Sequence, residues 1–137
     1  MTPTERHLLR VRRMRIMVAA ARQQVERFGS RVTAGEVFAH LNAELAALQG
    51  ERITSAELAE RSGQPAQNIS RWIQKSDNLR LVDHPEDGRA KVVDVIEPAE
   101  VEAFLDATLN NDLAIIKESK ESGRLDQYLS EDLDSRK

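Results

Sequence analysis

The chain has 137 residues, of which 40% are hydrophobic, so it is long enough for one domain with a modest core. It contains no Cys, which excludes disulfides, thiolate catalysis and thiolate metal sites. No apolar run approaches the ~20 residues of a membrane-spanning helix, and the N-terminus lacks the continuous apolar core of a signal peptide. We therefore expect a cytoplasmic protein, whose net charge of −3 argues weakly against nucleic-acid binding.

Charge is distributed unevenly along the chain. Residues 1–31 hold eight Arg against two Glu, a net charge of +6, whereas residues 100–137 hold ten acidic and five basic residues, a net charge of −5. Three explanations are left open: a solvated helical face, a basic arm that binds nucleic acid, and pairing of the two ends within the chain or across a dimer.

Two helices are predicted in the first 50 residues. The first runs from about Thr4 to Phe28, and a second begins at the capping-box sequence Thr33–Glu36 and ends at Gln49-Gly50. Each should bury one apolar stripe against a neighbouring helix. The stripe of the first helix contains Val11, Met14, Val18, Ala21, Val25 and Phe28, and that of the second contains Val37, Phe38, Leu41, Leu45 and Leu48.

A helix-turn-helix pair is predicted in the middle of the chain. Thr54 and Glu57 have the spacing of a capping box, so a short helix should begin at Ser55. Ser62-Gly63 should end it, because Gly tolerates the left-handed conformation found at helix C-termini. A second helix is predicted over residues 65–76, since Pro is tolerated in the first turn.

The helix over residues 65–76 has one apolar and one polar face. Ile69, Trp72 and Ile73 form an i, i+3, i+4 stripe that should pack into the core, so we expect Trp72 inside rather than stacked on a base. The other side carries groups that could bond base edges or phosphates from a major groove. These candidate DNA-binding residues are Ala66, Gln67, Asn68, Ser70, Arg71, Gln74 and Lys75.

A β-hairpin is predicted next, with arms at residues 79–82 and 91–96, the second rich in β-branched residues. Asp87-Gly88 predicts the turn between them, in which Gly accepts positive φ and Asp87 bonds its own backbone. Arg89 and Lys91 leave the turn as cations and are further candidate DNA-binding residues.

Two more helical segments are predicted after Pro98, which suits the first turn of a helix. One runs to roughly Lys120, where Ser122-Gly123 breaks it, and a short last helix follows. Their apolar residues are Val101, Phe104, Leu105, Thr108, Leu109 and Leu113 in the first, and Leu125, Tyr128, Leu129 and Leu133 in the second. The predicted fold class is mainly α with a small β-hairpin.

The middle of the chain resembles the winged helix-turn-helix of the MarR family of bacterial transcription regulators. The matching segments are Leu58-Ala59, Ile69-Ser70-Arg71, Leu81-Val82 and Asp87-Gly88-Arg89, of which the last, in the wing, is the most specific. The chain departs from the family pattern at Ser76, at Arg80 and over residues 95–98, so it resembles a divergent member.

The resemblance implies a sequence-specific regulator of transcription that binds double-stranded DNA as a homodimer. The recognition helix, residues 65–76, would enter the major groove, and the wing, residues 83–91, would enter the minor groove with Asp87 supporting Arg89. The protein would act in a bacterial cytoplasm, associated with the nucleoid.

The resemblance also implies how a single domain, residues 1–137, is divided. Residues 1–31 and 98–133 would form a helical dimerisation region, and residues 32–97 the DNA-binding lobe. The candidate dimerisation residues are Val11, Met14, Val18, Val101, Phe104, Leu105, Leu125 and Leu129.

The sequence leaves open a second function, protein binding, and the binding of a small-molecule effector. The acidic net charge would also allow a winged-helix module that binds protein and not DNA, since a fold can host several functions. Many MarR-family members sense small aromatic acids or oxidants. The lack of Cys excludes a thiol switch here, whereas a small-molecule effector is compatible with the sequence.

Enzymatic activity is not expected. His7, His40 and His84 do not have the spacing of metal ligands, and the six Gly are isolated rather than gathered in a phosphate-binding loop. Carboxylate pairs such as Glu86-Asp87 fall in predicted exposed turns, where burial would not tune their acidity. We therefore expect no catalytic residue, metal or cofactor.

Overall fold

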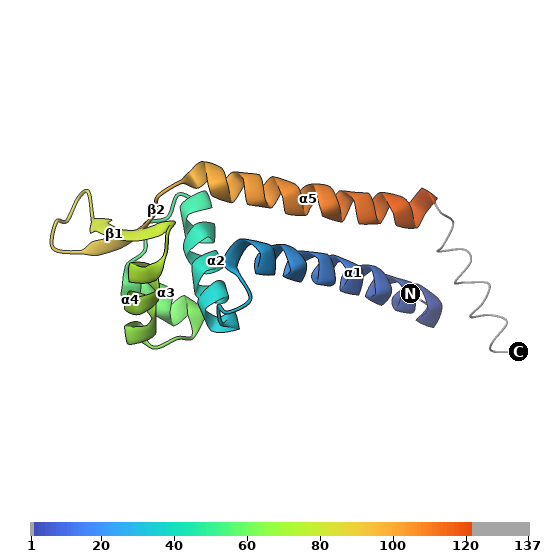
Figure 1. Cartoon of the computed structure of the whole chain (residues 1–137), viewed down its shortest axis with the longest axis horizontal. Coiled ribbons are helices and arrows are strands. Elements are labelled where there is room, and N and C mark those ends of the chain that lie inside the picture. Colours follow the sequence, from blue (N-terminus) through green and yellow to red (C-terminus); the bar gives the residue numbers. More distant parts are fainter. Residues whose placement is uncertain (1, 122–137) are drawn as a thin grey trace, which may run out of the picture. The chain divides into compact units, whose positions relative to one another are not determined.

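The computed structural model describes residues 2–121, which contain five helices and one β-hairpin (Figure 1). The elements are α1 (Pro3–Phe28), α2 (Ala34–Leu48), α3 (Ser55–Ser62), α4 (Ala66–Lys75), β1 (Leu79–Asp83), β2 (Lys91–Val95) and α5 (Pro98–Glu121). This confirms the predicted fold class. The predicted last helix, with Leu125 and Leu129, lies outside the described residues. Within the described part of the chain, no helix is long and apolar enough to cross a membrane.

The chain divides into two compact units. Residues 28–102 form one, which we call the winged-helix lobe, and α1 up to Arg27 with α5 from Ala103 belongs to the other, which we call the helical unit. The first turn of α5 is therefore part of the lobe, and Val101 is buried in the core of that lobe. The side chain of Val101 thus packs inside the lobe, and its contribution to a dimerisation surface stays a prediction.

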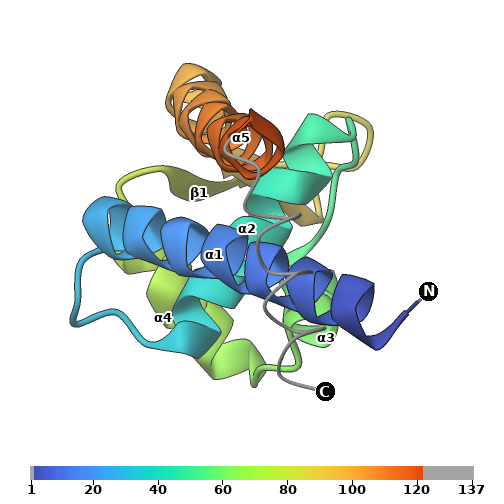
Figure 2. The same ribbon diagram turned by 90° about the vertical axis from the view of Figure 1, so that its right-hand side faces the viewer.

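The core of the winged-helix lobe joins α2, α3, α4 and the hairpin. Figure 2 shows α3 and α4 next to each other, and α2 and the hairpin also contact them. Leu58 of α3 and Ile69 of α4, each 1% exposed, are the largest fully buried side chains in the described residues. Together with Ile73 they close the space between the two helices of the predicted helix-turn-helix.

The ends of α3 follow the predicted capping signals. The Thr54 hydroxyl accepts a hydrogen bond from the backbone N–H of Glu57 at 3.1 Å, and the Glu57 carboxylate accepts one from the N–H of Thr54 at 3.4 Å. Gly63 ends the helix in the left-handed conformation, with φ of 63°. This capping box and this helix end are therefore confirmed.

The inward face of α2 differs from the predicted one. Small residues, among them Ala39 and Ala43, face the core, whereas Phe38, Leu45 and Leu48 are more than half exposed. The periodicity identified an apolar stripe correctly, but the alanine stripe beside it makes the closer packing with α3 and the hairpin.

The junction between α4 and β1 is held by two polar side chains. The Ser76 hydroxyl accepts hydrogen bonds from the N–H groups of Asn78 and Leu79 at 3.2 and 3.1 Å. Asn78 is buried, and its Oδ1 accepts from the N–H of Glu97 at 2.8 Å, while its backbone oxygen accepts from the N–H of Ile96 at 2.8 Å. Ser76, a departure from the MarR pattern, thus caps the turn, and Asn78 ties both strands to the start of α5.

Replacing Asn78 with Ala should destabilise the lobe by about 1–3 kcal/mol, because the part-buried N–H of Glu97 would lose its acceptor and the buried Asn78 side chain would be truncated. Urea unfolding followed by circular dichroism at one protein concentration measures the change. Asp77→Ala, one residue earlier at an exposed position, is the control and should leave the unfolding midpoint unchanged. Equal midpoints for the Asn78 variant and the parent would contradict this role.

Candidate nucleic-acid interface

The orientation of α4 is set by its buried side. Ile69 and Ile73 are buried, and Trp72 is partly buried against the core, so the predicted helical register and the interior position of Trp72 are confirmed. The helix is one residue shorter at each end than the predicted range 65–76, because Pro65 and Ser76 are its caps. The opposite side exposes Ala66, Gln67, Ser70, Arg71, Gln74 and Lys75, with Asn68 half-buried at its edge.

Two candidate DNA-binding residues of α4 bond to each other. The guanidinium of Arg71 donates a hydrogen bond through Nη2 to Oδ1 of Asn68 at 3.1 Å. The helix contains no acidic residue, so its two charged side chains, Arg71 and Lys75, are both cations. The exposed side of α4 therefore offers amides, a hydroxyl and positive charge, which are the groups that bind phosphates and base edges.

The body of the hairpin is electrically neutral. β1 and β2 pair antiparallel, with Arg80 opposite Asp94 and Asp83 opposite Lys91. The Arg80 guanidinium lies 2.9 Å from the Asp94 carboxylate, and the Lys91 ammonium bonds the Asp83 carboxylate. Lys91, a candidate DNA-binding residue, is therefore already paired with an anion on the neighbouring strand. Strand register brings these pairs together, which local sequence spacing could not predict.

The loop of residues 84–90 forms the wing tip and projects beyond the helices of its lobe (Figure 1). Its ends are joined by a hydrogen bond from the N–H of His84 to the oxygen of Ala90 at 2.9 Å. Asp87 bonds its own backbone as predicted, because its Oδ1 accepts from the N–H of Arg89 at 3.1 Å. The exposed Arg89 side chain is thus carried on a backbone that Asp87 holds.

The predicted conformation of Gly88 is wrong. In the described residues, positive φ is confined to Gly29, Gly50 and Gly63. The seven-residue loop reverses direction through the Asp87–Ala90 hydrogen bond at 3.1 Å, so it does not need the two-residue turn that requires Gly at positive φ.

In the helical unit, polar side chains connect α1 with α5. Arg15 forms an ion pair with Glu118 at 2.9 Å, and Gln23 donates to the backbone oxygen of Ala107 at 3.4 Å. Arg27 lies over the ring of Phe104, with 4.6 Å from its guanidinium carbon to the ring centre. The Arg15–Glu118 ion pair supports the third explanation of the charge asymmetry, pairing of the basic and acidic ends within the chain, for one residue of the basic segment.

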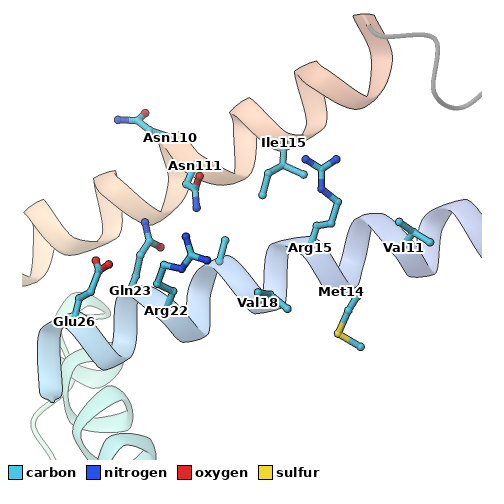
Figure 3. A pocket seen from close by; sticks show the side chains of 11 residues that line it. Val11, Met14, Arg15, Val18, Arg22, Gln23, Glu26, Asn110, Asn111 and Ile115 are labelled. Atoms are coloured by element: carbon cyan, nitrogen blue, oxygen red, sulfur yellow. The ribbon is translucent and has the colours of Figure 1, made fainter. Parts of the chain in front are cut away.

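A cavity of about 940 Å³ lies between the two helices of this unit, and Figure 3 shows Arg15 and Gln23 extending toward α5 while Met14 points away from it. The predicted apolar stripe of α1 does not bury within the described chain. Met14 and Val18 are 59% and 54% exposed. On α5, Phe104 is half-buried, whereas Leu105 and Leu109 are exposed. Both helices therefore keep apolar side chains in solvent.

No protein-family model and no curated protein sequence matches the chain. Solved structures match it over almost its entire length. MepR, a transcription regulator of the Staphylococcus aureus multidrug efflux pump MepA, is 17% identical, with a TM-score of 0.58 and 100% coverage of both chains. A point mutant of MepR bound to an oligodeoxyribonucleotide is also 17% identical, with a TM-score of 0.60, covering 97% of this chain and 98% of its own.

These matches establish the fold. MepR is a MarR-family regulator, and the match includes both the long helices and the winged lobe, since it extends over the full chain. The resemblance that the sequence motifs indicated is therefore confirmed by the architecture: the chain has the winged-helix fold of the MarR-family transcription regulators.

Proposed function

We propose that the chain is a double-stranded DNA-binding transcription regulator and a divergent member of the MarR family. The observation that carries this proposal is the exposed side of α4, which is free of acidic residues and is turned outward by the burial of Ile69 and Ile73. A helix of this kind fits the major groove, with Gln67, Asn68 and Arg71 toward the bases. A MepR structure with the same fold is bound to an oligodeoxyribonucleotide, which supports the proposal.

The wing would contribute one cation, Arg89, to the minor groove. A narrow minor groove concentrates negative potential and attracts Arg. Arg89 is exposed at the projecting loop, whereas Lys91 is paired with Asp83 on the hairpin. We therefore assign the wing contact to Arg89 and give Lys91 a structural place in the strand.

Replacing Arg89 with Ala should weaken binding to many DNA sequences and flatten its salt dependence. The slope of log K against log salt changes by ~0.9 for each phosphate charge that is no longer neutralised. Fluorescence anisotropy with a random-sequence duplex at several salt concentrations measures the slope. The double variant Asp83→Ala/Lys91→Ala removes a neutral ion pair and is the matched control, for which we expect an unchanged slope. The wing assignment fails if the two variants change the slope equally.

A homodimer would cover the exposed apolar side chains of the helical unit. Met14, Val18, Leu109 and Leu113 are each more than half exposed, and α1 and α5 meet through polar contacts around a cavity. Apolar surface gathered on one pair of helices marks an interaction site. A second copy would bury it and would place two recognition helices about one turn of DNA apart on a roughly palindromic site.

Leu109→Asp should convert the dimer to a monomer, because it would place a charge in the apolar interface. Sedimentation at micromolar concentration should then give the monomer mass of 15.4 kDa, while the parent gives twice that value. Ala103→Asp adds the same charge at an exposed position of α5 outside the Leu105, Leu109 and Leu113 stripe, and should remain dimeric. A monomeric parent would contradict the proposed assembly.

A protein-binding module is the second candidate, favoured by the pairing of Arg80 and Lys91 with carboxylates on the hairpin. It predicts a dimer without detectable DNA binding at low salt. The same anisotropy titration with the parent therefore separates the two functions.

A further inference from the structure

The bond between Asn68 and Arg71 restricts what the exposed side of α4 can recognise. Arg71 Nη2 donates to Asn68 Oδ1 across 3.1 Å, one helical turn apart, and this bond restrains a long side chain that is otherwise exposed. Arginine loses conformational entropy when it binds, so a guanidinium that is already held in place binds at a lower entropic cost.

The bond also changes the hydrogen-bonding character of Asn68. A free Asn recognises adenine by donating to N7 and accepting from the N6 amino group. In this structure its oxygen is next to a guanidinium, so the amino group of an adenine would meet a cationic donor. One lone pair of Asn68 Oδ1 is still available beside the guanidinium, but most of the available groups in the pair are donors: the amide N–H groups of Asn68 and the remaining N–H groups of Arg71.

The charged residues of α4 reinforce this donor character. Lys75, the other charged residue of the helix, is also a donor, and no carboxylate between Ala66 and Lys75 could accept from the amino group of cytosine. Guanine is the base whose major-groove edge presents two adjacent acceptors, O6 and N7.

We propose that Arg71 reads a guanine in each half-site through its O6 and N7, and that Asn68 is a positioning residue that holds the guanidinium in place. This inference rests on the DNA-binding role proposed above. If the two residues contacted bases independently, substituting each would affect a different base pair. Under this proposal, substitution of Arg71 and substitution of Asn68 affect recognition of the same base pair.

The test begins with selection of a preferred duplex from random DNA by the parent protein. Each guanine of that duplex is then replaced in turn by 7-deazaguanine, which lacks the N7 acceptor, or by inosine, which keeps N7 and O6 and lacks only the minor-groove amino group. We expect 7-deazaguanine at one position of each half-site to weaken the parent by about 5- to 100-fold, and inosine at that position to have little effect.

Variants of Arg71 and Asn68 show which side chain causes the sensitivity to 7-deazaguanine. Arg71→Ala should bind the unmodified and 7-deaza duplexes equally, Asn68→Ala should show a reduced difference at the same position, and the double variant should be no worse than Arg71→Ala. Circular dichroism confirms that each variant is folded. The inference is overturned if the parent selects DNA but tolerates 7-deazaguanine everywhere, or if Arg71→Ala keeps the sensitivity. Failure of the parent to bind any DNA at low salt would instead overturn the proposed function and, with it, this inference.

Discussion

The burial of Ile69 and Ile73 is the constraint on which the candidate DNA-binding surface depends. Both side chains pack into the core with Leu58, and burying an aliphatic side chain of this size contributes about 1.5–3 kcal/mol. The two together fix the rotation of α4 about its axis. Arg71 and Lys75 are turned toward solvent as a consequence, so the chemistry of the surface follows from packing on the other side of the helix.

Hydrogen bonds, rather than apolar packing alone, connect this helix to the wing. Ser76 caps the turn into β1, Asn78 ties the hairpin to the backbone at Glu97, and the N–H of Val93 donates to the oxygen of Ile53 at 2.8 Å. Ion pairs between the strands then neutralise the hairpin. Arg80 and Lys91 are exposed but paired with carboxylates, so Arg89 is the cation of the described hairpin and its loop that lies outside these ion pairs.

The features predicted most accurately from the sequence are those that depend on residues close together in the chain. The capping residue Thr54, the helix end at Gly63 and the apolar stripe of α4 depend on neighbours within one or two turns, and the structure bears them out. The ion pair of Lys91 depends on strand register, and the burial of Val101 depends on which unit the first turn of α5 joins. Periodicity identifies an apolar stripe on a helix but carries no information on what covers it. The predicted inward faces of α2 and α5 therefore agree only in part with the buried ones.

Cross-linking from one position on α4 tests the central claim most directly. The chain has no Cys, so Ser70→Cys and Gln49→Cys each give one site for a photoactivatable label, the first on the exposed side of α4 and the second at the end of α2. With a duplex DNA present, our account predicts efficient cross-linking from position 70 and little from position 49. DNA binding without cross-linking from position 70, or equal yields from both positions, would contradict the assignment of α4 as the recognition helix.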